Sequence, residues 1–245
     1  MKVVFLGATK GIGRALARLM AARGDSLFLL GRDAADLERS ARDLEVRGSK
    51  APVGTAPCDL RDSSSFEPAL AKAEAAHGGF DTVVVTAGLF ASQEALEGDP
   101  ALAESLLAAN FTGTIVFCEA ARKRLLARGG GTLCVFSSVA GERGRKPVIL
   151  YGASKAGLSA YLEGLDHKFR AAGLRTVCVK PGFVKTSMTE GLKPPPFAGE
   201  PEPVARRVLG AIDRGTPVVY APPMWALVML VIRNLPRQVM RRVGF

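Results

Sequence analysis

A phenol and an ammonium group stand four positions apart in the segment YGASK, where Tyr151 precedes Lys155. On a helix, residues four apart project from the same face, so these two side chains would be neighbours. A free phenol has a pKa of about 10, and a nearby cation favours the phenolate and lowers that pKa. Such a pair could exchange a proton with a carbonyl or alcohol oxygen at neutral pH. The plain alternative is a tyrosine at the edge of the core and a solvated lysine.

A glycine-rich turn near the N-terminus has the residue types that bind phosphate. The apolar run 2–6 is followed by GATKGIG, in which Gly7, Gly11 and Gly13 open a helical pattern. Glycines there let the backbone approach a pyrophosphate, and the first N–H groups of the helix attract its charge. The spacing is G-x-x-x-G-x-G, not the commoner G-x-G-x-x-G. Glycine also serves purely steric needs in such turns, but the position directly after a strand favours phosphate binding.

The turn after the second apolar run indicates which dinucleotide would bind. Folds that bind NAD usually place an acidic residue there for the ribose hydroxyls, whereas a basic residue accommodates the extra phosphate of NADP. The turn holds Arg32, and Lys10 of the glycine turn could reach the same phosphate. Asp33 either binds the ribose or caps the next helix. The two cations favour NADP.

Strand-like and helix-like segments alternate along the chain, which has 245 residues and suits a single domain. Strands are predicted at 2–6, 26–30, around Val53, and at 82–85, 132–136, 175–179 and 217–220. Helices are predicted at about 12–20, 34–46, 63–76, 101–126, with a bend at Gly113, 151–171, and before the last strand. The alternation implies parallel pairing, and apolar runs such as TVVV fit strands buried on both faces. We therefore expect an α/β protein, a single-domain Rossmann-type doubly wound parallel sheet flanked by helices.

Small and polar residues follow most of the predicted strands. They are GATKGIG at 7–13, CDL at 58–60, TAG at 86–88, SSVAG at 137–141 and KPGFVKT at 180–186. In a doubly wound sheet, ligands bind beyond the carboxyl ends of the strands. These segments would line that edge, where an extended cofactor could lie.

In this order and spacing, over about the first 190 residues, these motifs resemble the classical short-chain dehydrogenase/reductase family. Ser138 precedes Tyr151 by thirteen residues, as the family's active-site serine precedes its tyrosine. The resemblance implies a catalytic tetrad of Asn110, Ser138, Tyr151 and Lys155. It also implies a cofactor site composed of Gly7, Thr9, Lys10, Gly11, Ile12, Gly13, Arg32, Asp59, Leu60, Ala87, Gly88, Tyr151, Lys155, Pro181, Gly182, Val184 and Thr186.

The family's tetrad implies a role for each of the four residues. Tyr151 would be the general acid when a carbonyl is reduced and the general base in reverse, and Lys155 would also hydrogen-bond the nicotinamide ribose. Ser138 would donate to the substrate oxygen as charge develops, and Asn110 would hold a water chain that delivers protons to the lysine. The alternatives are that Ser138 satisfies backbone groups at a strand end and that Asn110 bonds locally in a bent helix.

The implied activity is that of an NADP(H)-dependent carbonyl reductase, which reduces a carbonyl to a secondary alcohol or catalyses the reverse. A non-catalytic dinucleotide-binding regulatory protein is an alternative, but such a protein has no need of Tyr151. Two positions depart from the family pattern: Leu6 stands where threonine is frequent, and Thr86 where asparagine is usual. These departures bear on cofactor affinity more than on the chemistry.

Composition excludes several other functions. The net charge is +10, but the basic residues are scattered and there are only three tyrosines and one tryptophan, so we expect no nucleic-acid binding. Four cysteines without a CxxC pair and two histidines argue against a structural metal. No signal peptide is recognisable, and the pattern is typical of a reduced, cytoplasmic protein.

The C-terminal third departs from the regular alternation. We expect a proline-rich substrate lid at 186–203 within a cofactor domain at 1–221, and an apolar and basic extension of that domain at 222–245. Nine continuous apolar residues, 224–232, are too few to span a bilayer, which needs about twenty. The extension could be a core or subunit contact in a homo-oligomer, line a channel for an apolar substrate, or lie peripherally on a membrane.

The lid and the extension are also similar to those of the reductases that act on a polyprenyl-phosphate-linked keto-pentose and work with an epimerising partner. This similarity points to a small-molecule or lipid-linked carbonyl or alcohol substrate. A reductase of a lipid-linked keto-sugar in cell-envelope synthesis is therefore a second interpretation of the function.

Overall fold

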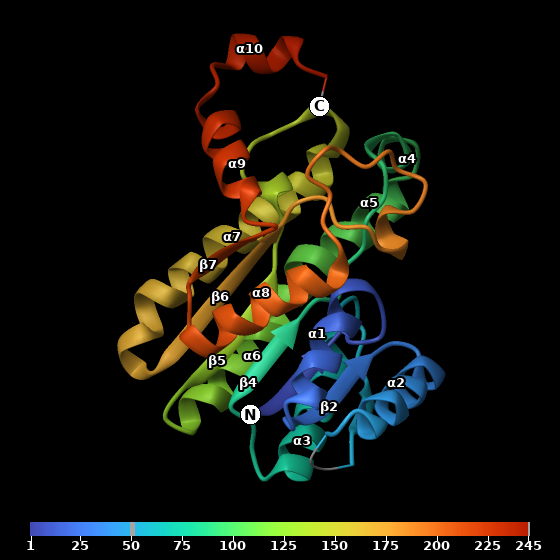
Figure 1. Cartoon of the computed structure of the whole chain (residues 1–245), viewed down its shortest axis with the longest axis vertical. Helices are drawn as coiled ribbons and strands as arrows, with labels where there is room; N and C mark the ends of the chain where they lie inside the picture. Colours follow the sequence, from blue (N-terminus) through green and yellow to red (C-terminus); the bar gives the residue numbers. More distant parts are fainter. Residues whose placement is uncertain (50–51, 245) are drawn as a thin grey trace.

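A single parallel sheet of seven strands organises the computed structural model, which describes residues 1–49 and 52–244 (Figure 1). Its order is β3-β2-β1-β4-β5-β6-β7. The strands are β1 (Lys2–Leu6), β2 (Ser26–Gly31), β3 (Gly54–Pro57), β4 (Thr82–Val85), β5 (Gly131–Phe136), β6 (Leu174–Pro181) and β7 (Val218–Ala221). The order reverses at β1, so the crevice beyond β1 and β4 is the topological switch point. The predicted doubly wound α/β fold is confirmed.

Helices cover both faces of this sheet (Figure 1). They are α1 (Gly11–Ala22), α2 (Ala34–Val46), α3 (Phe66–His77), α4 (Gln93–Gly98), α5 (Pro100–Leu107), α6 (Thr114–Ala127), α7 (Ile149–Phe169), α8 (Pro201–Arg214), α9 (Met224–Asn234) and α10 (Arg237–Arg242). Buried side chains of α1, α2 and α8 form one core cluster with the sheet, and those of α3, α6 and α7 form the other.

Strand β1 shows why the strands are apolar throughout. Val3 and Phe5 belong to the core on one face, and Val4 and Leu6 belong to the core on the other. Successive strand residues point to opposite faces, so a strand covered on both sides is apolar at every position. All four side chains are buried.

The single long helix predicted at 101–126 is interrupted in the structure, so this prediction is wrong for the middle of the segment. Helices α5 and α6 are joined by a π-helical turn, Ala108–Gly113, in place of a simple bend. A Cβ built on Gly113 would lie 1.7 Å from the carbonyl oxygen of Leu60, so only glycine fits this approach. Such turns are frequent at functional sites.

Taken as one continuous stretch, Pro100–Ala127 is long and apolar enough to cross a membrane by composition. Within the described residues, no other helix meets that test. Its apolar side chains are used in this fold, however, because Phe117 and Leu125 are fully buried in the core beside the sheet.

The C-terminal part also differs from the expectation. The predicted lid at 186–203 ends too late, because α8 already begins at Pro201, with proline in its first turn. Two helices, α9 and α10, follow the last strand, and α9 packs Met229 and Ile232 against Val139. The short helix α4 has no counterpart in the prediction.

Candidate active site

Helix α7 carries Tyr151 and Lys155 along the carboxyl end of β5. The Lys155 ammonium donates to the carbonyl oxygen of Phe136 at 2.9 Å and lies 5.7 Å from the centre of the Tyr151 ring. The Ser137 hydroxyl donates to the carbonyl oxygen of Lys155 at 2.8 Å, which ties the helix to the strand end. The two side chains therefore share one face, and Lys155 is buried, so the solvated-lysine alternative is wrong.

Ser138 follows β5 and lies close to Tyr151. Its hydroxyl accepts a hydrogen bond from the backbone N–H of Ala140 at 3.1 Å and lies 3.5 Å from the carbonyl oxygen of Pro181. A hydrogen bond between the Ser138 and Tyr151 side chains also acts on the pKa of the phenol. Ser138 thus partly serves the strand end, as its structural alternative predicted, and its hydroxyl also reaches the predicted proton donor.

Asn110 is fully buried within the π-helical turn. Its amide accepts from the backbone N–H of Leu89 and donates to the carbonyl oxygen of the same residue, both at 2.7 Å. These partners are distant in sequence, so the alternative of purely local bonding is wrong. A Cβ built on Gly88 would lie 3.0 Å from Asn110 Oδ1 and 3.7 Å from Lys155 Nζ, so these two members of the predicted tetrad meet just after β4.

The pKa of Tyr151 is not lowered by Lys155 as the sequence predicted. Burial raises the pKa of the Tyr151 phenol to about 12, and the hydrogen bond from Ser138 only partly opposes this shift. Burial also lowers the pKa of Lys155 to about 8. We predicted that the ammonium would lower the pKa of the phenol. That prediction is wrong for this structure because the loss of hydration dominates at both side chains.

The glycine turn of β1 and α1 is built by close approaches. Gly7 has a φ of +101°, and a Cβ built on Gly13 would lie 2.2 Å from the carbonyl oxygen of Gly7. Thr86, which departs from the family pattern, donates to that same oxygen at 2.8 Å. The substituted threonine therefore still joins the end of β4 to the glycine turn.

The start of α1 is electrostatically open to an anion. Lys10 precedes the helix without a side-chain cap, and the first turn, at Gly11, Ile12 and Gly13, contains no acidic residue. The first N–H groups of a helix carry partial positive charge and bind phosphate well. This arrangement fits the pyrophosphate of a dinucleotide.

The adenosine end of the predicted site is rich in cations. Asp33 caps α2, because its carboxylate accepts from the backbone N–H of Asp36 at 2.9 Å, so the capping alternative for this aspartate is confirmed. Lys10 Nζ lies 3.8 Å from an oxygen of Asp36. Arg32 is exposed, and its charge helps to hold the pKa of the Asp59 carboxyl low, after the larger effect of Arg61.

A hollow of about 220 Å³ adjoins this region between the glycine turn and α2. Its lining includes Thr9 and three arginines, Arg14, Arg18 and Arg39. These arginines were not predicted as site residues, because their helical spacing matches a solvated face. Only the packing of α1 beside α2 shows that they converge.

The segment after β6 returns to the glycine turn. A Cβ built on Gly11 would lie 3.2 Å from Thr186, so these two predicted cofactor residues are in contact. Val184 pairs with Gly199 in a parallel bridge, which closes the base of the loop that we call the lid, residues 186–199. The two ends of this loop are therefore held close together.

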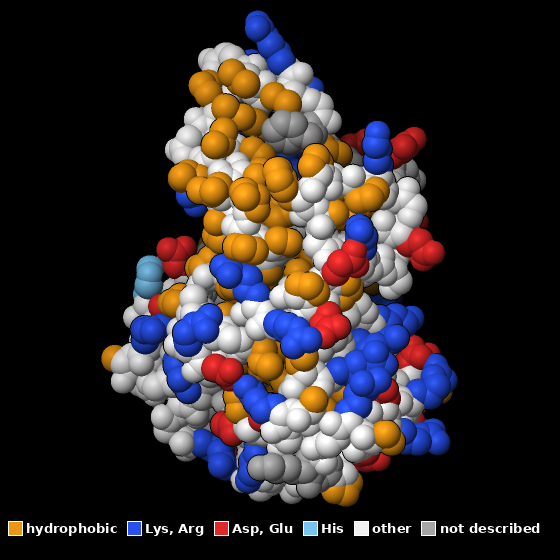
Figure 2. All heavy atoms as spheres, in the orientation of Figure 1, with side chains coloured by type: hydrophobic (Ala, Val, Ile, Leu, Met, Phe, Trp, Pro, Cys, Tyr) orange, Lys and Arg blue, Asp and Glu red, His pale blue; other side chains and the backbone are white. Residues whose placement is uncertain are grey.

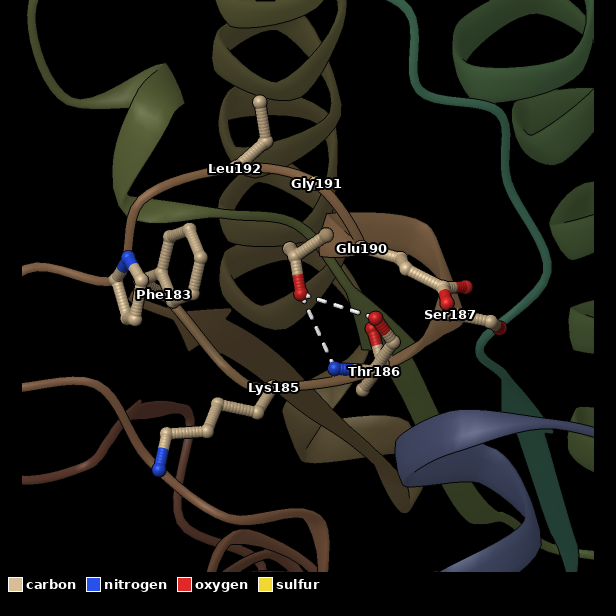
Figure 3. Close-up of a pocket in the computed structure, with 9 residues that line it drawn as sticks. Phe183, Lys185, Thr186, Ser187, Glu190, Gly191 and Leu192 are labelled. Atoms are coloured by element: carbon tan, nitrogen blue, oxygen red, sulfur yellow. Dashed lines mark hydrogen bonds between the residues drawn. The ribbon is translucent and has the colours of Figure 1, made fainter.

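The lid surrounds a hollow of its own, of about 490 Å³, which Figure 3 shows. Thr189 stabilises this loop: its hydroxyl accepts from the Thr186 N–H at 3.0 Å and contacts the Thr186 carbonyl oxygen at 3.1 Å (Figure 3). All lining residues belong to residues 183–194, and none is a member of the tetrad. The predicted tetrad therefore lies outside this hollow.

Aromatic rings lie against Tyr151 and against the segment that follows β6. The rings of Phe90 and Tyr151 pack edge to face with centres 5.2 Å apart. Trp225 of α9 lies against Gly182, where a Cβ would come within 2.1 Å of its indole nitrogen. Neither Phe90 nor Trp225 was predicted as a site residue, because no motif marks them.

The remaining predicted cofactor residues follow the same strand ends. They are Leu60 after β3, Ala87 after β4, and Pro181, the last residue of β6. No group of three or more metal-ligating side chains occurs within residues 1–49 and 52–244.

Comparisons with known proteins agree with this geometry. The short chain dehydrogenase family matches residues 1–196. An uncharacterized oxidoreductase of Mycobacterium tuberculosis is 36% identical over 243 residues, covering 98% of this chain and 96% of its own length. One from Streptomyces coelicolor is 36% identical over 251 residues, covering 98% and 95%. A solved structure described as a short chain dehydrogenase/reductase family protein has a TM-score of 0.77 and 29% identity, covering 89% of this chain and 94% of its own.

Proposed function

The chain belongs to the short-chain dehydrogenase family, and on this premise we propose that it is an NADP(H)-dependent carbonyl reductase. Members of the family are oxidoreductases that use a nicotinamide dinucleotide. The observation that carries the finer proposal is the convergence of Ser138, Tyr151, Lys155 and Asn110 beside the end of β4 and the glycine turn.

Tyr151 is the proposed proton donor to the substrate oxygen. A reduced nicotinamide held beside the glycine turn and Lys155 would supply the hydride that forms the new C–H bond at the carbonyl carbon. Ser138 donates a hydrogen bond to the oxygen as it becomes negative, and the phenolic proton of Tyr151 then completes the hydroxyl group. Because the phenol has a pKa of about 12, it is protonated at neutral pH, which suits the reductive direction.

Lys155 is the proposed source of the next proton. Its pKa of about 8 lies near neutrality, so the ammonium can give up a proton more easily than an exposed lysine can. Asn110, whose amide carbonyl faces the same space beside Gly88, would hold the water that links this lysine to solvent.

The test of this chemistry is Tyr151→Phe, assayed by NADPH oxidation across a panel of carbonyl compounds. Loss of general acid catalysis predicts a fall in kcat of about 10² to 10⁴-fold, with NADPH binding unchanged by fluorescence titration. Tyr161→Phe is the matched control: this tyrosine lies on the same helix, but its hydroxyl bonds Glu119 at 2.7 Å. Undiminished turnover by Tyr151→Phe would discard the proposed acid. NADPH binding by the wild type without turnover on any carbonyl would instead favour the regulatory alternative.

Arg32 and Lys10 support the choice of NADP over NAD, because Asp33 is engaged as a helix cap. A charge-assisted contact to the extra phosphate is worth about 1.5 to 3 kcal/mol. Arg32→Ala should therefore raise the Kd of NADPH by roughly 10- to 100-fold and leave that of NADH unchanged. Arg42→Ala, an exposed arginine of α2 paired with Glu38, is the control. An unchanged preference in Arg32→Ala would contradict the assignment.

A further inference from the structure

Helix α9 is apolar on both of its sides, but only one side is covered. Met229 and Ile232 are buried against Val139, whereas Leu227, Leu230 and Val231 are 62%, 50% and 63% exposed. A helix on a protein surface normally turns polar residues to solvent. Figure 2 shows hydrophobic side chains gathered over this end of the molecule, above the arginine-rich cofactor half.

The charged side chains of the segment around this apolar face are of one sign, and one of them, Arg233, pairs with Glu142 of the loop after β5. Residues 214–245 contain five arginines and no aspartate, glutamate or lysine. Three of these arginines, Arg237, Arg241 and Arg242, lie on α10, which follows α9 directly. We refer to Leu227, Leu230, Val231 and these three arginines as the docking surface.

A distant loop holds the docking surface in place and adds further positive charge. The guanidinium of Arg143 donates to the carbonyl oxygen of Leu235 at 2.7 Å, and Lys146 Nζ donates to that of Arg241 at 2.7 Å. Both bonds use backbone acceptors at the ends of α9 and α10, so they consume no acidic side chain. The surface is thereby positioned before any partner arrives.

The lid adjoins the same surface. The indole N–H of Trp225 donates to the carbonyl oxygen of Phe197 at 3.2 Å, which connects α9 to the lid. Met188, Leu192 and Phe197 of the lid are exposed as well. Uncovered apolar side chains therefore continue from α9 onto the lid.

Two occupants fit an uncovered apolar face: a second copy of the chain or a lipid bilayer. In a two-fold dimer the same patch meets itself, and residues 214–245 supply no acidic side chain to pair with the arginines of α10 across that interface. Anionic headgroups would neutralise those arginines while the leucines enter the acyl boundary. Eleven residues of helix reach about 16 Å, roughly half of a bilayer core, so α9 would lie along the surface and not cross it.

We propose that the docking surface binds the face of an anionic lipid bilayer. The lid then faces the same bilayer. If the proposed function holds, the carbonyl substrate is apolar enough to be taken up from the lipid phase. This last consequence rests on the proposed function, but bilayer binding itself does not require turnover.

Vesicle sedimentation of the full chain tests the proposal without substrate. The wild type should pellet with vesicles of phosphatidylcholine and phosphatidylglycerol, and much less with phosphatidylcholine alone. Arg237→Ala with Arg241→Ala should weaken binding by about 25-fold, since each basic residue near an anionic surface contributes about fivefold. Leu227→Ser with Leu230→Ser should weaken it by at least about tenfold through lost apolar insertion.

The controls are substitutions of the same type on α2, at the other end of the molecule (Figure 1): Val46→Ser and Arg42→Ala, both at exposed positions. They should bind vesicles like the wild type. Failure of the wild type to pellet with anionic vesicles, or equal loss in the controls, would overturn the proposal. Light scattering tests the other occupant. If the wild type is a dimer, the leucine substitutions dissociate it and no vesicle binding is observed, the docking surface is an interface with a second copy of the chain. Vesicle binding by an inactive Tyr151→Phe variant would separate this proposal from the chemistry.

Discussion

The tetrad region and the C-terminal tail, residues 222–244, differ in which kind of side chain they bury and which they expose. Around the end of β4, polar groups are buried, and those of Asn110 and Lys155 have hydrogen-bond partners at 2.7 to 2.9 Å. In the tail, apolar groups such as Leu227 are exposed and have no cover. A buried polar group is costly unless it is paired, and an exposed apolar face is costly unless something covers it. The first region is therefore complete within one chain, whereas the second is not.

This difference separates what the molecule does alone from what it does with a partner. The tetrad depends on contacts that the fold itself supplies. The tail depends on a surface outside the chain, so its substitutions should affect association more than stability. Three changes, ordered by expected size, put this contrast to the test.

Asn110→Ala should give the largest loss of stability. It removes the side-chain partner of both the Leu89 backbone N–H and carbonyl groups, which are half-buried, and each unpaired group costs up to about 1 to 3 kcal/mol. We expect the free energy of unfolding to fall by about 4 kcal/mol in urea denaturation. Asn234→Ala is the matched control, since its side chain also bonds a backbone carbonyl, that of Leu230, but at an exposed site. A cost in Asn110→Ala as small as in that control would show that the two regions do not differ.

The buried Lys155 should make stability depend on alkaline pH. Its pKa is about 8 in the folded chain and 10.5 as a free side chain. Between these values the unfolded chain binds more protons, so stability rises with pH, by up to about 3 kcal/mol. Urea titrations at pH 8 and pH 9, below the ordinary tyrosine pKa of 10 at which the unfolded chain loses its phenolic protons, should show this rise in the wild type relative to Lys155→Met. Parallel pH profiles for the two proteins would mean that this lysine is solvated in solution.

Leu227→Ser should have the smallest effect on stability. The side chain is largely exposed, and surface substitutions usually change stability by less than about 0.5 kcal/mol. Thermal unfolding without vesicles should therefore match the wild type. Met229 lies on the covered side of the same helix and is fully buried. The Met229→Ser variant is therefore expected to be strongly destabilised in the same assay. A large loss in Leu227→Ser would mean that the chain itself covers this face.

Much of the fold could be predicted because its pattern is local. The strand at 2–6 and the helix at 34–46 have the predicted bounds, since apolar runs and a capping aspartate define them within a few residues. The π-helical turn could not be predicted, because it depends on the approach of Gly113 to Leu60, fifty-three positions earlier. The end of the lid was misplaced because proline breaks a helix in its interior but is favoured at its start, as at Pro201.

The placement of the predicted site residues followed from the sequence more directly than their pKa values did. Tyr151 and Lys155 share a face because helical spacing alone requires it. Their pKa shifts depend on how much water the surrounding β-strands and helices exclude, and sequence spacing carries no measure of that. The arginines near the glycine turn and Trp225 were missed for a related reason: they converge on the site only through the packing of α1, α2 and α9.

The extra residue in the π-helical turn Ala108–Gly113 fixes the phase between α5 and α6. One residue corresponds to about 100° of rotation in a regular helix. Deleting a single residue from this turn would join α5 and α6 into one regular helix. The side chains of one of the two helices would then point in different directions relative to those of the other. This segment should therefore accept changes of residue type at its exposed positions far more readily than any change in its length.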